Sequence, residues 1–245
     1  MSKYPPFSKS PITEALLDIR VELPSSFDVS QFDSFYEKVK NRFPQKQKKM
    51  AIATHFRISE TGMETDPSPS VPMGFLYRSS TDGKIVQARR DGFTFNKLKP
   101  YEKWEVFKQE AHELWNTYIS ECRPSRITRI ALRYINKIEI PMPFDFNDYI
   151  LTIPKIPEKL PQDLSSFFMR FSIANPHMEN TLANITQTFQ APSEGRLPFI
   201  FDIDVFQIKE YGDSNEMWEA FESLRAFKND VFLESLTTRA KDMFK

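Results

Sequence analysis

The chain has 245 residues, of which 40% are apolar and 23 are phenylalanine, so it carries ample material for a large hydrophobic core. Acidic and basic residues number 33 each, and a net charge of zero gives no long-range attraction to nucleic acid or to anionic lipid. The N-terminus lacks the apolar run of a signal peptide, no stretch of about 18 apolar residues could span a membrane, and the one cysteine, Cys122, cannot form an internal disulfide. We therefore expect a cytoplasmic protein.

The first half of the chain alternates between strand and helix periodicities. Apolar residues at every second position over residues 15–23 predict a half-buried strand, and an apolar stripe over residues 30–43 predicts a helix. The elements expected next are a strand around residues 50–58, a polar loop over 62–72, and strands at 75–77, 85–89 and 93–98. Because Asp82-Gly83 and Asp91-Gly92 separate the last three strands, these are predicted to form a meander.

The second half is predicted to repeat this plan after a long helix. Pro100 is expected to begin that helix, whose apolar face includes Trp104. The elements expected next are a strand over residues 130–140, a short helix near 146–151, a proline-rich linker, and strands at 167–173, 182–189 and 199–208. Asp213 with Glu216 resembles a capping box, which predicts a last helix towards Phe244 with a break near Asn229.

Two short patterns recur in both halves. Glu102-x-Trp104-Glu105-x-Phe107 matches Glu216-x-Trp218-Glu219-x-Phe221, and Ala15-Leu16-x-x-Ile19 matches Ala131-Leu132-x-x-Ile135. Both matches keep the same order at a separation of roughly 115 residues, which favours an internal duplication. We expect an α+β fold of two pseudo-repeated units, residues 1–124 and 125–245, packed tightly as two units or as one domain. Each unit is expected to be an antiparallel-rich sheet covered on one face by a long helix, with the Trp and Phe residues as core anchors.

Longer motifs resemble those of one family. They are Pro11-Ile12-x-Glu14-Ala15, Asp91-Gly92-Phe93-x-Phe95-Asn96-x-Leu98, Pro100-Tyr101-x-x-Trp104, Leu132-Arg133-Tyr134-Ile135-Asn136-x-Ile138 and the tail Phe232-x-x-Ser235-x-Thr237. Over nearly the whole chain, the sequence is similar to a sporadically distributed family of uncharacterised prokaryotic proteins of similar length. Ala131 stands where the family pattern leads us to expect glycine. The resemblance implies no activity and no catalytic residues, and the family's patchy distribution implies accessory genes, such as those of defence or mobile elements.

Several common chemistries lack the residues that they need. Only six glycines are present, none of them spaced as in a phosphate-binding loop, and no Gly-x-Ser-x-Gly elbow occurs. His55, His112 and His177 lie far apart and lack zinc-ligand spacing. Cys122 is expected at the C-terminus of a helix, where the helix dipole disfavours a thiolate. We therefore predict no cofactor and assign no catalytic residue and no metal ligand.

The most suggestive polar residues lie on two predicted strands. Arg129, Arg133 and Lys137 recur every four residues and so share one face of a strand, while Asp202 and Asp204 share one face of another. If both faces line one groove, a charged cleft could hold a polar or anionic ligand, and the paired carboxylates could hold Mg²⁺ or supply a base. The candidate ligand-binding residues are Arg129, Arg133, Asn136, Lys137, Asp202 and Asp204. The alternative is that both are the solvated outer faces of half-buried strands.

Local positive charge leaves a role with nucleic acid open. Residues 45–49 contain three lysines, Arg89 and Arg90 follow, and Phe93 and Phe95 could stack on bases. The alternative is that the lysine run is a solvated loop and the hairpin aromatics belong to the core.

We expect a non-catalytic binding or interaction protein that acts through a protein partner or a small polar ligand. The runner-up is an enzyme with an unrecognised charged cleft, acting on a phosphate- or nucleotide-containing substrate. A nucleic-acid-binding module ranks third. No membrane partner is expected, and the composition is compatible with a homodimer.

Overall fold

The computed structural model describes residues 7–51, 54–59, 62–67 and 71–245. Its strands are β1 (Ile12–Glu22), β2 (Gln45–Ala51), β3 (Thr54–Ser59), β4 (Gly62–Pro67), β5 (Val71–Arg78), β6 (Lys84–Arg89), β7 (Gly92–Leu98), β8 (Arg126–Pro141), β9 (Phe168–Ala174), β10 (Thr181–Phe189) and β11 (Arg196–Tyr211). Its α-helices are α1 (Phe32–Val39), α2 (Trp104–Cys122), α3 (Ser214–Glu234) and α4 (Thr238–Asp242), with the short 3₁₀ segments η1 (Val29–Gln31) and η2 (Phe146–Asp148).

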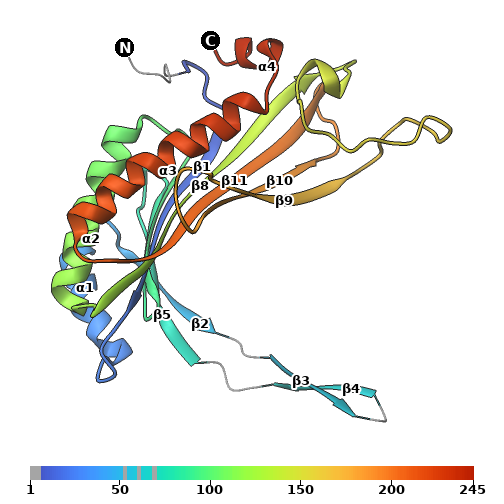
Figure 1. The fold of residues 1–245 in the computed structure, drawn as a ribbon. Helices are drawn as coiled ribbons and strands as arrows, with labels where there is room; N and C mark the ends of the chain where they lie inside the picture. The colour runs from blue at the N-terminus through green and yellow to red at the C-terminus, as the bar shows by residue number, and fades with distance from the viewer. Residues whose placement is uncertain (1–6, 52–53, 60–61, 68–70) are drawn as a thin grey trace.

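Nine strands form one sheet in the order β2-β5-β6-β7-β1-β8-β11-β10-β9, and each neighbouring pair is antiparallel. β3 and β4 form a separate hairpin. Helices α1, α2 and α3 lie on one side of the large sheet, and the two ends of the sheet curve away from them (Figure 1). The described chain is therefore an α+β protein with a large antiparallel sheet. The predicted meander is confirmed, since β5, β6 and β7 are consecutive neighbours.

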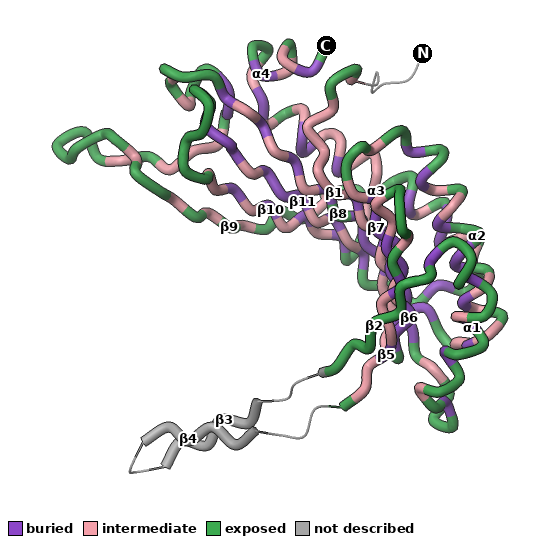
Figure 2. Tube along the Cα trace, turned by 180° about the vertical axis from the view of Figure 1, so that it is seen from behind, coloured by how far each residue is buried: buried purple, intermediate pink, exposed green. Residues whose placement is uncertain are grey.

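Period-two patterning decides which side chains face the helices. In β1, Ala15, Leu17 and Ile19 are fully buried, whereas Asp18 and Arg20, at the alternate positions, lie on the opposite face. The long strands β8 and β11 alternate in the same way at the centre of the sheet (Figure 2). One hydrophobic cluster joins these strands to the helices, so both halves of the chain contribute to a common core.

Helices α2 and α3 run side by side in opposite directions. The indole of Trp104, at the start of α2, donates to the Glu222 carboxylate of α3 at 2.9 Å, and the indole of Trp115 donates to Ser214 at the start of α3 at 3.5 Å. Trp104 and Trp218 are both buried, as predicted for core anchors. The two tryptophans differ in helical position, however. Trp104 is the first residue of α2, whereas α3 begins four residues before Trp218, at Ser214.

Helix α2 begins later, and α3 continues further, than the sequence predicts. Pro100 does not start α2, because the N–H of Lys99 still donates to the Thr13 carbonyl of β1 at 2.9 Å and the chain has not yet left the sheet. The predicted break near Asn229 is also wrong, since α3 continues to Glu234. Burial of Val231 and Phe232 against the core outweighs the low helix propensity of asparagine and aspartate.

Two expected loops are strands. Residues 62–67 pair with β3 as β4, and the lysine run over residues 45–49 belongs to β2 at one edge of the large sheet. Neither segment shows a clear alternation of apolar and polar residues, so the sequence pattern does not predict these strands. They form through backbone hydrogen bonds to the neighbouring strands. The strand expected over residues 50–58 and the loop expected over 62–72 also include residues 52–53 and 68–70, which lie outside the described residues.

Candidate functional site

The structure divides the six predicted ligand-binding residues between two faces of the sheet. Arg129, Arg133 and Lys137 of β8 lie on the helix-free face, and the register pairs Arg133 with Asp204 of β11. Asp202 faces the same way, two residues earlier on β11. Asn136 points to the helix-covered face, because a residue next to Lys137 in a strand has the opposite orientation.

Each of the three predicted cations has an acidic partner on the helix-free face. The guanidinium of Arg133 binds Asp202 with three contacts of 2.5 to 3.1 Å. Arg129 contacts Asp18 of β1 at 3.2 Å, and Lys137 contacts Glu139 at 2.8 Å. This pairing neutralises the positive charge that an anionic ligand would need.

Among the described residues, Asp204 has no direct ion pair of this kind. Burial raises its pKa, Arg129 and Arg133 oppose the rise, and the neighbouring carboxylate of Asp202 adds to it. Asp202 and Asp204 therefore differ in their surroundings: Asp202 binds the guanidinium of Arg133, whereas burial raises the pKa of Asp204.

A further ion-pair network, which the sequence did not single out, is centred on Asp18 of β1, the partner of Arg129. Asp18 accepts from Arg89 at 2.8 Å, from Thr94 at 2.8 Å and from Arg20 at 2.9 Å. Arg89 also binds Asp91 at 2.9 Å. Asp18 and Arg20 alternate with buried apolar residues in β1, and that pattern identifies them as a polar face but carries no information about their partners. On the helix-free face, Arg20, Arg89, Arg129, Arg133 and Lys137 are thus each paired with a carboxylate.

Three of the residues proposed to contact nucleic acid have partners inside the fold. Phe93 and Phe95 are fully buried beneath α2, so neither ring is free to stack on a base. In β2, the ammonium of Lys46 lies 4.2 Å from the centre of the Phe75 ring and bonds to Asp33.

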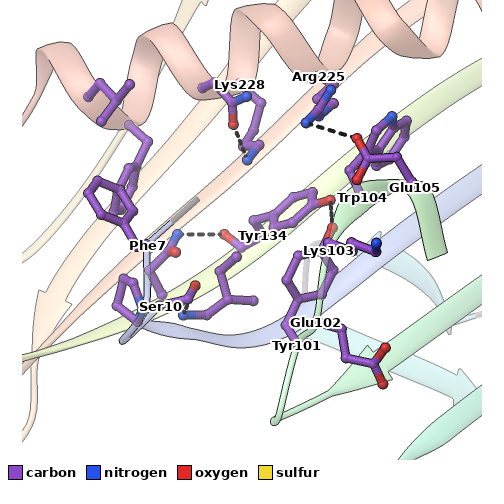
Figure 3. Close-up of a pocket in the computed structure, with 16 residues that line it drawn as sticks. Phe7, Ser10, Tyr101, Glu102, Lys103, Trp104, Glu105, Tyr134, Arg225 and Lys228 are labelled. Atoms are coloured by element: carbon purple, nitrogen blue, oxygen red, sulfur yellow. Dashed lines mark hydrogen bonds and ion pairs between the residues drawn. The ribbon is translucent and has the colours of Figure 1, made fainter. Parts of the chain in front are cut away.

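Asn136 lines a different site, which is a cavity of about 310 Å³ on the helix-covered face of the sheet. The cavity lies between α3, the start of α2, the central strand β8 and the segment that leads into β1 (Figure 3). Its aromatic walls are Phe7, Tyr101, Trp104, Tyr134 and Phe232, and its polar groups include Ser10, Asn136, Arg225, Lys228 and Asn229.

Lys228 is the most unusual group in this cavity. It projects from α3 towards Tyr134 (Figure 3), only 9% of it is exposed, and its Nζ lies 3.9 Å from the centre of the Tyr134 ring. Its hydrogen-bond acceptor is the amide Oδ1 of Asn229 at 2.5 Å, and among the described residues no carboxylate forms a salt bridge with it. Burial, assisted by the nearby charge of Arg225, lowers the pKa of Lys228 from 10.5 to about 7.

Two tyrosine hydroxyls form a pair in the same cavity. The hydroxyls of Tyr101 and Tyr134 lie 3.0 Å apart and share one hydrogen bond. Burial raises the pKa of Tyr101 to about 12 and that of Tyr134 well above its usual value. Both groups therefore stay protonated at neutral pH and act as neutral hydrogen-bonding groups.

Arg225 and Trp104 stand together at one side of the cavity. The guanidinium of Arg225 lies 5.5 Å from the centre of the Trp104 ring and 3.7 Å from both Glu105 and Glu222. Trp104 in turn donates to Glu222. These contacts fix the orientation of the indole and hold a second cation close to Lys228.

One signal in the sequence could have drawn attention to Lys228. The buried positions of α3 include Phe221, Leu224 and Val231, and Lys228 falls on the same stripe, where the helical period calls for an apolar residue. A lysine on an apolar stripe must either reach solvent or enter a specialised environment. The cavity supplies that environment.

Other groups with reactive chemistry are less suited to a site. Burial raises the pKa of the Cys122 thiol, the last residue of α2, to about 12, so the thiolate is disfavoured as expected. Within the described residues, no three His, Cys, Asp or Glu side chains are grouped so as to hold a metal ion. In the same part of the chain, no helix has the length and apolar character needed to cross a membrane. Comparisons with protein families, curated proteins and solved structures gave no match.

Proposed function

We propose that this protein binds a small molecule in the cavity between α2, α3 and β8. The observation that carries the proposal is a buried lysine, Lys228, that faces a cavity of about 310 Å³ and has no carboxylate partner within the part of the chain that the structure describes. Ligand sites are commonly about 300–1,000 Å³, mostly apolar, with a few polar groups that fix orientation. The walls formed by Tyr101, Trp104 and Tyr134, with Lys228 and Arg225 as polar groups, have that composition.

The size and lining restrict the chemistry of the ligand. A cavity of about 150 Å³ holds one benzene molecule, so this cavity has room for a substituted ring. The aromatic walls favour a planar apolar body. The two nitrogen groups of Arg225 and Lys228 favour an oxygen function, a carboxylate or a carbonyl, at one end. The ligand class is therefore a small aromatic or unsaturated acid or carbonyl compound.

A direct test uses benzoate, benzaldehyde and benzyl alcohol as probes, because they share a ring and differ only in the oxygen function. Titration is followed by calorimetry and by tryptophan fluorescence, since Trp104 forms a wall of the cavity. We expect benzoate and benzaldehyde to bind in the millimolar range or tighter, and benzyl alcohol to bind more weakly.

A cavity-filling substitution supplies the control for location. Leu233→Trp places a large ring in the cavity and should abolish binding, whereas Gln109→Trp, on the exposed face of α2, should leave it unchanged. The proposal is wrong if none of the three probes binds the native protein, or if Leu233→Trp leaves their affinity unchanged.

We further propose that the two halves of the chain arose by duplication. From the centre of the sheet outwards, the strand order is β1, β7, β6, β5 on one side and β8, β11, β10, β9 on the other. On both sides, the first strand of the half is followed by three later strands in reverse chain order, which supports the proposal. In each half, a long helix follows the strand next to the centre, α2 after β7 and α3 after β11. The sequence resemblance supports membership of the sporadically distributed prokaryotic family, and the single buried Cys122 supports a reducing compartment such as the cytoplasm.

A further inference from the structure

We infer that Lys228 is an amine nucleophile that condenses with the carbonyl carbon of an aldehyde or ketone held in the cavity. This inference rests on the proposed function and goes further, because it names the reactive class of ligand and assigns a covalent step. Lysine amines that form such imines are desolvated by an apolar pocket or lie beside a second cation. Lys228 meets both conditions, with Tyr134 against its ammonium and Arg225 one turn earlier on α3.

The surroundings of the amine leave its lone pair available. Asn229 accepts one N–H of Lys228 through its amide oxygen, a contact that the neutral amine can make as well as the ammonium. Two glutamates, Glu102 and Glu105, line the cavity, and Glu105 contacts Arg225. Within the described residues, therefore, Lys228 is not fixed in its protonated form by a salt bridge.

The protonation equilibrium favours reaction at neutral pH. With a pKa of about 7, roughly three quarters of the Lys228 side chains carry a neutral amine at pH 7.5, compared with about 0.1% of an ordinary lysine. The face of the Tyr134 ring attracts the protonated form and opposes part of this effect, whereas burial and Arg225 favour the neutral amine. The other titratable groups that line the cavity are Tyr101, Glu102, Lys103 and Glu105.

The step balances without an oxidant or a reductant. The lone pair of Nζ attacks the carbonyl carbon, the electrons of the C=O π bond move to oxygen, and one proton passes from nitrogen to that oxygen to give a carbinolamine. The second proton of the nitrogen then passes to the hydroxyl group, the C–O bond breaks as water leaves, and the nitrogen lone pair forms the C=N bond. One of the two hydroxyl protons of Tyr101 and Tyr134 makes the hydrogen bond between these two side chains. The other proton is the hydrogen-bond donor that we assign to the carbinolamine oxygen.

Reductive trapping with the full chain tests this assignment. The native protein is incubated with benzaldehyde and sodium cyanoborohydride, the intact mass is measured, and peptide mapping locates the benzyl group. We expect one benzyl group per chain on Lys228, formed at least tenfold faster than on any other lysine. Lys228→Arg should lose this fast modification, because it keeps a cation but removes the primary amine. Lys108→Met removes a surface lysine on α2 outside the cavity and should react like the native protein.

The probes without a reactive carbonyl separate this inference from the proposed function. If benzoate binds in a way that Leu233→Trp abolishes and Lys228 is not labelled faster than other lysines, the inference is wrong while the binding function stands. If no probe binds and Lys228 is not labelled, both are wrong. Unchanged fast labelling in Lys228→Arg also overturns the inference. Circular dichroism and urea unfolding establish that each variant is folded, and Lys228→Met, which leaves no cation to bury, provides a second variant without the amine.

Discussion

The Nζ atom of Lys228 lies 3.9 Å from the centre of the Tyr134 ring and is hydrogen-bonded to an amide oxygen of Asn229. A buried ammonium without a counter-charge is costly, because desolvation is not repaid by an ion pair. Proteins commonly retain such groups where function requires them. The burial of Lys228 against Tyr134 therefore affects the stability of the protein as well as ligand binding.

Replacing Lys228 by methionine should stabilise the protein most at and below pH 7. Between pH 7 and pH 10.5 the unfolded chain binds the Lys228 proton and the folded chain does not, so the native protein gains stability as pH rises and the advantage of the variant shrinks. One pKa unit corresponds to 1.36 kcal/mol, so the fall of the Lys228 pKa from 10.5 to about 7 limits the gain in the free energy of unfolding of the variant to about 5 kcal/mol. Urea unfolding of both proteins at pH 6.5 and pH 9.5 measures the difference. An advantage that is equal at both values would contradict the shifted pKa.

Removing Arg133 should cost more stability than removing Asp202. The Arg133 side chain is 46% exposed and can turn to solvent when its partner is lost, whereas the Asp202 side chain is 12% exposed and would stay near Asp204. We expect Arg133→Ala to lower the free energy of unfolding by about 1–3 kcal/mol and Asp202→Ala by about 1 kcal/mol or less. A double-mutant cycle measures both costs and their coupling. Equal costs would show that the two residues are equally solvated.

Asp18→Asn should destabilise the protein at neutral pH, and the loss should fade in acid. Burial by itself raises the pKa of Asp18, but Arg89 and Arg20 outweigh burial and hold it below 3.8. The charged carboxylate thus contributes stability above that pH and loses the contribution as pH falls through the folded pKa. Because Arg89 is nearly buried, losing one of its two carboxylates should cost about 2–4 kcal/mol. Unfolding at pH 7 and pH 3 tests this. Glu210→Gln, on an exposed side chain, is the control.

Gly92→Ala should destabilise the protein strongly. Gly92 has φ +149°, and a Cβ at this position would lie 2.2 Å from the carbonyl oxygen of Ile19 on the neighbouring strand β1. Backbone atoms of a central strand cannot move aside cheaply, so we expect a loss of about 2–4 kcal/mol. Gly195→Ala is the matched control. Gly195 has φ +71° with no atom within 4 Å of the added Cβ, so only backbone strain of about 1–2 kcal/mol applies. Similar losses in thermal or urea unfolding would argue against the steric explanation.

Local sequence patterns were sufficient to predict most strands of the large sheet. Alternation in β1 identified both the buried set around Leu17 and the polar set around Asp18, since the two-residue period of a strand is a local property. The Asp-Gly turns predicted the β5-β6-β7 meander for the same reason, because a tight turn forces its flanking strands to pair. The capping interaction of Asp213, which accepts from the N–H of Glu216 at 2.9 Å, was also visible locally.

Which elements cover each face of the sheet could not be predicted from local patterns. The sequence grouped Asn136 with Arg133 and Lys137, but adjacent strand positions face opposite ways, and Asn136 lies at the helix-covered cavity while the two cations lie on the helix-free face. The burial of Phe93 and Phe95 depends on the packing of α2, and the desolvated environment of Lys228 depends on β8 and on the start of α2. Strands, turns and helix stripes were thus predictable from the sequence, because they depend on residues that are close together in the chain. Long-range packing alone decided where the cavity lies and that a lysine faces it, because these depend on residues more than 90 positions apart in the chain, such as Tyr134 and Lys228.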